Sequence, residues 1–198
     1  LDVSVKTVAI IQARLGSVRL PNKVMKLIEG VPMIELLLKR LAKSKEIDKI
    51  VVATSSYEKN KIMIDHIQKL EFTCELGSDD DVLHRYLQSA QKYHSDIIVR
   101  ITGDCPLIDP FLVDEMIKEF KSLNVDYLSN TLSPSYPDGL DIEVFTIEAL
   151  KRANNETQKP FNREHVTPYL KNSKLFKTFN YQNKENLSDL RWTVDDPE

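Results

Sequence analysis

"AIIQARLGSVRLPNK", residues 9–23, joins an apolar, β-branched run directly to a loop rich in positive charge. Together with the residues before it, the run reads "KTVAIIQ" and is bounded by polar side chains, which is typical of a buried strand. The loop carries Arg14, Arg19 and Lys23, whereas the whole chain of 198 residues has a formal net charge of -3. We therefore expect a buried strand to deliver this loop to a small anion.

Downstream of this stretch, apolar strands alternate with amphipathic helices. The expected strands are residues 49–55, 72–78 and 96–104. The expected helices begin at Pro32, run from about 58 to 70, begin at Asp80, and run from 110 to about 121. Such alternation predicts a parallel sheet that is covered by helices on both faces.

The alternation changes after residue 125. Strands are expected at 125–130 and 139–145 without a full helix between them, and again near 175–181 and 190–194. Helices are expected near 146–155 and 162–171, with Thr146 and Asn162 as capping residues. This order predicts a mixed sheet in one α/β domain over residues 1–198. A start without Met and an end at "VDDPE" lead us to expect a piece of a longer chain.

Composition narrows the classes of function. The chain is 29% charged and 41% hydrophobic, which is an ordinary balance for a soluble protein. Its pI of about 5.9 argues against a general nucleic-acid binder, because no basic face or lysine-rich tail offsets it. Two cysteines, Cys74 and Cys105, cannot form a disulfide framework, and no apolar stretch is long enough to cross a membrane. We expect a cytoplasmic protein that binds neither nucleic acid nor membrane.

The first loop has the chemistry of a phosphate site. In open α/β sheets, ligands bind beyond the carboxyl ends of the strands, where this loop begins. Gly16 allows close approach of the backbone, Ser17 offers a hydroxyl, and Arg14, Arg19 and Lys23 supply cations suited to phosphate oxygens. The pattern is neither a GxGxxG fingerprint nor a GxxxxGK[ST] loop, so it supports neither a dinucleotide oxidoreductase nor a P-loop NTPase. The alternative is a solvated basic turn.

Two acidic positions are candidate metal ligands. Asp104 in "RITGDCPLIDP" follows an apolar strand and is expected at the same rim as the first loop, where Mg²⁺ could lie between it and phosphates. Its alternative role is an Asx turn. Asp195 in "RWTVDDPE" could complete the divalent site, or it could cap a helix.

These motifs together resemble the cytidylyltransferase family that activates acidic sugars, which includes CMP-KDO and CMP-acylneuraminate synthetases and the spore coat polysaccharide biosynthesis protein F type. The resembling segments occur in family order between residues 8 and 198 and read "IIQARLGSVRLPNK", "GSDDDVLHRY", "RITGDCPLIDP", "REHVTPYL" and "TVDDPE". The resemblance implies a Rossmann-like three-layer α/β/α sandwich with a mostly parallel, mixed central sheet, of the nucleotide-diphospho-sugar transferase-like type.

The resemblance also implies an activity. A CTP-dependent nucleotidyltransferase would transfer CMP to a sugar acid or a sugar or polyol phosphate and release pyrophosphate, for cell-surface polysaccharide biosynthesis. Its partners would be CTP and a small anionic acceptor substrate. The hairpin insertion that forms dimers in the sialic acid and KDO branches has no obvious counterpart, so a homodimer stays open.

Site residues follow from the resemblance by motif. Catalytic roles fall to Arg14, Lys23 and Asp104, and Mg²⁺ would be held by Asp104 and Asp195. The nucleotide contacts would be Gln12, Ala13, Arg14, Gly16, Ser17, Arg19, Lys23, Thr54, Ser55, Asp81, Arg85 and Arg100.

Four further residues are candidates for the acceptor substrate. Asp141 and Glu143 in "GLDIEVF" are expected on one strand face, which either lines the acceptor pocket or meets solvent. Arg163 would contact an anionic acceptor. His165 would act as a general base or simply bond nearby backbone.

Two other functions remain open at this stage. A glycosyltransferase of similar fold would use Asp79–Asp81 as its metal motif, although acidic residues at that place also suit a helix start. A non-catalytic module that binds sugar nucleotides would bind without turnover.

Overall fold

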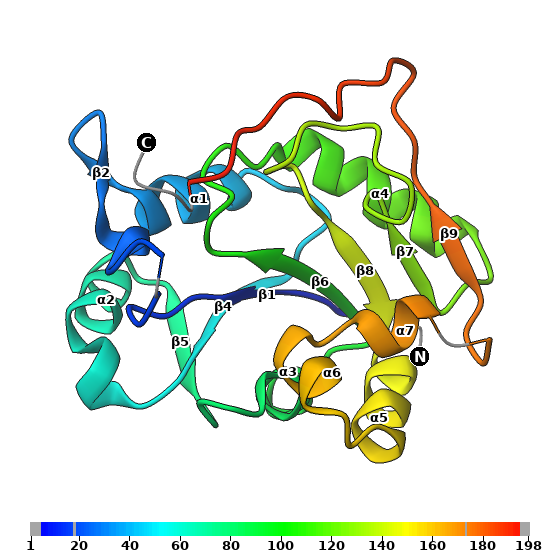
Figure 1. Cartoon of the computed structure of the whole chain (residues 1–198), viewed down its shortest axis with the longest axis horizontal. Helices are drawn as coiled ribbons and strands as arrows, with labels where there is room; N and C mark the ends of the chain where they lie inside the picture. Colours follow the sequence, from blue (N-terminus) through cyan, green and yellow to red (C-terminus); the bar gives the residue numbers. More distant parts are fainter. Residues whose placement is uncertain (1–4, 18, 173, 195–198) are drawn as a thin grey trace.

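The computed structural model describes residues 5–17, 19–172 and 174–194. In this part of the chain, one seven-stranded sheet has the order β5-β4-β1-β6-β8-β7-β9 (Figure 1). The strands are β1 (Thr7–Gln12), β4 (Lys49–Thr54), β5 (Thr73–Leu76), β6 (Ile97–Thr102), β7 (Tyr127–Ser129), β8 (Glu143–Thr146) and β9 (Thr178–Asn180). Strands β5, β4, β1 and β6 are parallel, and β8 runs antiparallel to β6 and β7. The predicted mixed sheet is confirmed.

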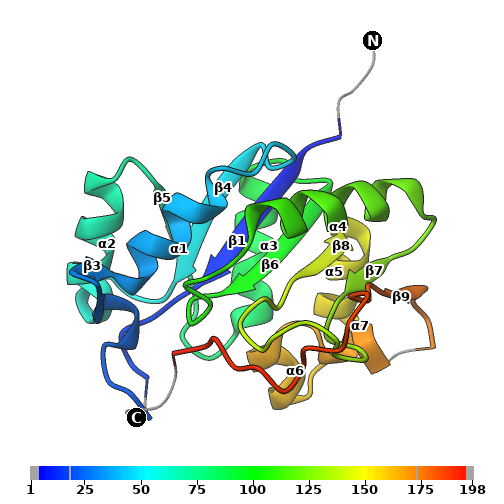
Figure 2. The ribbon, with the colours of Figure 1, turned by 90° about the horizontal axis from the view of Figure 1, so that it is seen from above.

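Helices cover both faces of the sheet. Ala9 and Ile11 of β1 pack into a core with α1 (Met33–Leu41), α2 (Tyr57–Lys69) and α4 (Pro110–Ser122). Val8 and Ile10 point to the other face and pack against α3 (Val82–Lys92) and α5 (Ile147–Glu156). Figures 1 and 2 show α1 and α4 on one side of the strands and α3 and α5 on the other. Alternation along β1 therefore produces the predicted three-layer sandwich.

Capping residues set several helix starts. The Thr146 side chain accepts a hydrogen bond from the Ala149 N–H, as predicted. Asp81, rather than Asp80, is the N-cap of α3 and accepts from the His84 N–H. Helix α4 begins at Pro110 behind Asp109, which accepts from the Phe111 N–H. The starts of α3, α4 and α5 thus depend on short polar side chains that satisfy N–H groups of the first turn.

Three expectations about elements were wrong. Asn162 is not a cap: it lies inside α6 (Pro160–His165), and a separate helix, α7 (Pro168–Asn172), follows Val166, whose φ is 68°. The positive φ at Val166 ends α6 at His165, and Pro168 then starts α7 as its first residue. Residues 190–194 form only one bridge, between Asp138 and Arg191, because the Val194 N–H bonds the Asp104 carbonyl instead of a ladder partner.

A small hairpin also went unpredicted. Strands β2 (Leu27–Ile28) and β3 (Val31–Pro32) pair beside a 3₁₀ turn, η1 (Lys23–Met25), and α1 starts at Met33 rather than Pro32.

Within the described residues, every helix is too short or too polar to span a bilayer.

Candidate functional site

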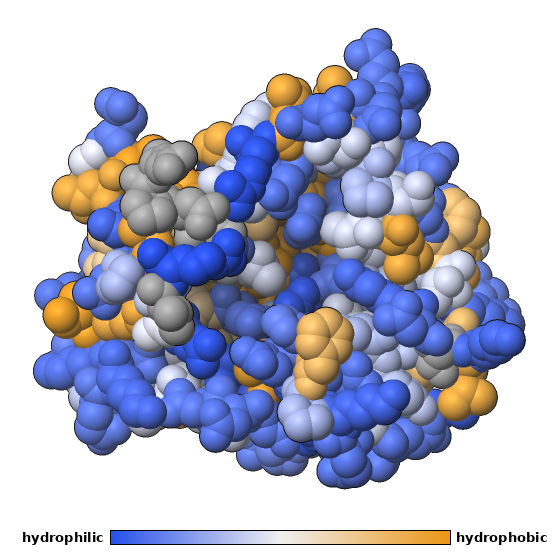
Figure 3. All heavy atoms as spheres, in the orientation of Figure 1, coloured by the Kyte–Doolittle hydropathy of each residue, from blue (hydrophilic) through white to orange (hydrophobic). Residues whose placement is uncertain are grey.

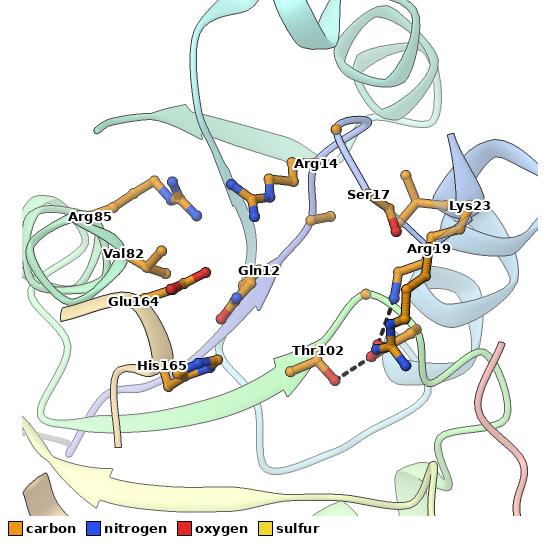
Figure 4. A pocket seen from close by; sticks show the side chains of 15 residues that line it. Gln12, Arg14, Ser17, Arg19, Lys23, Val82, Arg85, Thr102, Glu164 and His165 are labelled. Atoms are coloured by element: carbon orange, nitrogen blue, oxygen red, sulfur yellow. Dashed lines mark hydrogen bonds and ion pairs between the residues drawn. The ribbon is translucent and has the colours of Figure 1, made fainter. Parts of the chain in front are cut away.

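A pocket of about 270 Å³ opens beyond the carboxyl ends of β1 and β6 (Figure 4). In the space-filling view, hydrophilic side chains surround a hollow over these strands (Figure 3). The lining residues are Gln12, Ala13, Arg14, Gly16, Ser17, Arg19, Lys23, Val24, Val82, Arg85, Thr102, Gly103, Asp104, Glu164 and His165. Most of the predicted nucleotide contacts therefore share one cavity at the edge where the fold class predicts a ligand.

One end of the pocket collects the loop cations. Asn22 adopts a left-handed conformation, with φ 55°, and η1 then brings Lys23 back across the end of β6. Ser17, Arg19 and Lys23 lie together at this end, and the Lys23 Nζ is 2.8 Å from Asp104 Oδ2 (Figure 4). Figure 4 shows Arg14 nearer to the opposite end, where it faces Arg85.

Asp104 is ionised at this end of the pocket. Burial opposes its ionisation, but hydrogen bonds from Lys23 and from Thr102 Oγ1, 2.5 Å from Oδ1, outweigh burial and hold its pKa below the ordinary 3.8. An ionised carboxylate beside a phosphate-type loop fits the ligand set of Mg²⁺, which takes one or two carboxylates together with substrate phosphates. Val194, which lies against Asp104, ends the described region. The second predicted ligand, Asp195, lies outside the described residues.

Gly103 sets the pocket floor between the two strands. Its N–H donates to the Gln12 carbonyl over 2.9 Å. A Cβ at this position would lie 3.0 Å from the same carbonyl oxygen and 3.1 Å from the Ala13 Cβ. Glycine therefore permits the close approach of strands β1 and β6 beneath the pocket.

The opposite end of the pocket is formed by α3 and α6. Arg85 is only 2% exposed, and its Nη1 donates to the Ser78 carbonyl. Its stem lies against Gly77, where a Cβ would come within 2.7 Å of the Arg85 Cγ. Burial lowers the pKa of Arg85. Glu164 and His165 of α6 face Arg85 and Gln12 across this end (Figure 4).

Two predicted nucleotide contacts lie away from the lining of this pocket. Arg100 is beneath it and ion-pairs with Glu143 while donating to Gln12. Asp81 caps α3 and ion-pairs with Arg163. The Asp81 carboxylate is thus used inside the protein. The structure supports its role as a helix cap rather than as part of a glycosyltransferase metal motif.

Thr54 and Ser55 also lie outside the first pocket. Thr54 is fully buried at the end of β4, and the Ser55 Oγ accepts from Asn60 Nδ2 over 2.9 Å. Ser55 lines a second, adjoining cavity that shares Arg14 and Gly16 with the first.

The four residues predicted for the acceptor substrate are not brought together. Only His165 lines the first pocket. Arg163 donates to the Asn154 carbonyl over 2.7 Å as well as pairing with Asp81. Asp141 precedes β8, whereas Glu143 is buried at its start. Their contact with an acceptor substrate stays a prediction.

Five lining residues were not among the predicted site residues: Val24, Val82, Thr102, Gly103 and Glu164. Thr102 and Gly103 directly precede Asp104, so the strand-end motif contained a signal for them. Glu164 is next to His165, but it could not be distinguished from a solvated helix residue.

Comparison with known proteins places this geometry in a family. The family model described as cytidylyltransferase matches residues 8–191. The uncharacterized protein MJ1063 of Methanocaldococcus jannaschii is 39% identical over 193 residues, which cover 96% of this chain and 78% of that protein. The spore coat polysaccharide biosynthesis protein SpsF of Bacillus subtilis is 34% identical over 168 residues, or 82% of this chain and 69% of that protein.

A solved structure agrees with the sequence relatives. The cytidylyltransferase of Leptospira borgpetersenii superimposes with a TM-score of 0.93 at 36% identity, and the match covers 96% of this chain and 82% of that one. The loop, the strand-end carboxylate and the sheet order thus occur in a chain that belongs to the cytidylyltransferase family.

Proposed function

We propose that this chain transfers CMP from CTP to a small anionic acceptor substrate, a sugar acid or a sugar or polyol phosphate, and releases pyrophosphate. The product would be an activated sugar for cell-surface polysaccharide biosynthesis, made in the cytoplasm. The observation that carries the proposal is the pocket end where Ser17, Arg19 and Lys23 meet the ionised Asp104. A cradle of cations suits a triphosphate, and family membership supports cytosine as its base.

The cationic side chains have a defined task in this reaction. An oxygen of the acceptor substrate attacks the α-phosphorus, and the bond to the bridging oxygen of pyrophosphate breaks. Negative charge grows on the leaving pyrophosphate, and Arg19 and Lys23 would offset it. Ser17 would donate its hydroxyl to a phosphate oxygen. His165 lines the same pocket and would accept the proton of an attacking hydroxyl.

Asp104, with Asp195 as the second proposed ligand, would hold Mg²⁺ against the nucleotide phosphates. The ion would supply positive charge to the phosphate oxygens when bound. In the structure, the Lys23 ammonium group lies against Asp104 where the metal ion would bind. On nucleotide binding, the Lys23 side chain would move from Asp104 to the phosphates.

The test is calorimetric titration of CTP, UTP, GTP and ATP, each with and without Mg²⁺. We expect selective CTP binding that Mg²⁺ strengthens. Lys23→Ala should weaken that binding roughly tenfold or more, because a charge-assisted contact is lost. Asp104→Asn should keep much of the binding but reduce pyrophosphate release, with an acidic sugar as acceptor, roughly 100-fold.

Lys26→Ala is the matched control, because Lys26 is exposed and lies outside the pocket. It should bind CTP as the wild type does. Preference for a nucleoside diphosphate would favour a glycosyltransferase instead. Binding without turnover across a panel of acidic sugars would favour a non-catalytic module, and normal turnover by Asp104→Asn would refute the metal assignment.

A further inference from the structure

Gln12 ends strand β1 in the middle of the pocket, between Arg14 and His165 (Figure 4). Its Oε1 accepts a hydrogen bond from Arg100 Nη2 over 3.1 Å. A guanidinium can only donate, so the carbonyl oxygen of the amide must be the atom that faces Arg100. The orientation of the Gln12 amide is therefore determined by its neighbour.

The other half of the amide remains available to a ligand. Among the described residues, no hydrogen bond of the protein uses the Gln12 Nε2 group, and the side chain lines the cavity. An NH₂ group is a donor only, so it suits a ligand oxygen and not a ligand N–H or an ammonium group. The pocket thus presents a donor of fixed polarity at its centre.

Arg100 is itself held firmly behind Gln12. Its side chain is 12% exposed, and it pairs with Glu143, which lies directly opposite across strands β6 and β8. Its guanidinium carbon also lies 5.9 Å from the ring centre of Tyr86. An ion pair between buried neighbours on paired strands leaves the guanidinium little freedom to rotate away from Gln12.

Glu143 anchors this arrangement from below. Its Oε1 accepts hydrogen bonds from Tyr127 Oη over 2.6 Å and from Thr167 Oγ1 over 2.7 Å, and Lys171 Nζ lies 2.8 Å away. Burial opposes ionisation, but the Arg100 and Lys171 charges outweigh it and lower the pKa of Glu143 to about 2. Every oxygen of this carboxylate is thus used inside the protein.

We propose that Gln12 donates a hydrogen bond to an oxygen of the bound nucleotide, and that Arg100 and Glu143 are positioning residues that hold its amide in this orientation. This inference rests on the proposed function in taking CTP as the ligand. It assigns Glu143 a role behind the pocket in place of direct contact with an acceptor substrate.

Gln12→Glu tests the polarity of the donor. The variant keeps an oxygen toward Arg100 but presents a carboxylate oxygen to the pocket in place of NH₂. We expect the Kd for Mg-CTP in calorimetry to rise roughly 10-fold to 100-fold, because the donor is lost and a negative charge meets the nucleotide. Gln12→Ala should raise the Kd roughly 3-fold to 10-fold. Gln91→Glu, the same change at an exposed position of α3, should leave the Kd unchanged.

Titration of inorganic tripolyphosphate identifies the oxygen. Weakening of both CTP and tripolyphosphate by the uncharged variant Gln12→Ala assigns the bond to a phosphate oxygen, and weakening of CTP alone assigns it to the ribose or base. An unchanged Kd for CTP in Gln12→Glu overturns the inference while the proposed function stands. If the wild-type chain binds no nucleoside triphosphate, the proposed function fails and this inference falls with it.

A double-mutant cycle tests the positioning role. Glu143→Gln should weaken CTP binding in the wild-type background but add nothing in the Gln12→Ala background, because its effect passes through the Gln12 amide. An equal loss in both backgrounds would mean that Glu143 is only structural. Thermal unfolding of each variant checks that it folds, and the Gln12→Glu comparison decides the polarity of the donor if Glu143→Gln does not fold.

Discussion

Asp141 holds a carboxyl group in surroundings that disfavour its charge. Burial, followed by the negative charges of Asp138 and Glu143, raises its pKa from 3.8 to about 6. The folded state therefore binds the Asp141 proton more tightly than the unfolded state does. The stability that this proton contributes is complete below pH 3.8 and is lost as the pH rises to about 6.

Asp141→Asn should consequently stabilise the chain at pH 7. We expect the free energy of unfolding to rise by roughly 1–2 kcal/mol at pH 7, and by almost nothing at pH 4. Urea titrations at the two pH values measure the difference. An equal gain at both pH values would show that charge is not the cause, and a loss at pH 7 would mean that the carboxylate makes a favourable contact.

At the scale of single residues, the sequence predicted the cationic loop better than it predicted the ion pair of Arg100 and Glu143 behind the pocket. Arg14, Ser17, Arg19 and Lys23 are neighbours in sequence, so their shared chemistry is visible before folding. Arg100 and Glu143 meet only through the register of β6 and β8, which no local pattern encodes. Glu143 thus looked like one more carboxylate for a ligand, whereas the structure uses it to hold Arg100.

Among the elements, the segment 187–194 depends on one glycine. The Trp192 N–H donates to the Asp138 carbonyl, and the Val194 N–H reaches Asp104 at the pocket. Gly139 has a φ of +106°, and a Cβ there would lie 2.7 Å from the Trp192 carbonyl carbon. A larger residue would therefore push the segment away from the Asp104 loop.

Gly139→Ala should both destabilise the chain and move Trp192. Strained φ alone costs about 1–2 kcal/mol, and the backbone clash adds to it. Gly30→Ala is the matched control, because Gly30 also has a positive φ, +79°, but nothing lies within 4 Å of its added Cβ. Trp192 is the one tryptophan in the sequence, so its emission reports the segment. Identical losses of stability with unchanged emission would show that the clash is relieved without movement.

Element types were more predictable than element ends. The β1, β4 and β6 runs are short, mostly apolar and largely buried, so local pattern and burial agree for these strands. The break between α6 and α7 depends on a positive φ at Val166, which is unusual for a β-branched residue and which tertiary packing imposes. The strands of the β2–β3 hairpin have two residues each, which is too short for an alternating apolar and polar pattern to show in the sequence.

At the scale of the molecule, the pocket is coupled to the whole fold through β1. This strand lies in the interior of the sheet, pairs with β4 and β6, and contributes to the cores on both faces. Its last residue, Gln12, continues directly into the ligand loop, so the loop conformation cannot survive the loss of the sheet. A ligand held by this loop therefore binds the native state only.

Saturating Mg-CTP should accordingly raise the temperature of a single, cooperative unfolding transition. At 100 times the Kd, the native state gains about 2.7 kcal/mol, which corresponds to roughly 5–10 °C for a domain of this size. Differential scanning calorimetry measures the shift, and Lys23→Ala at the same nucleotide concentration should show much less of it. Two separate transitions, or binding by titration without any shift, would mean that the nucleotide is held by a part of the chain that unfolds independently of β1.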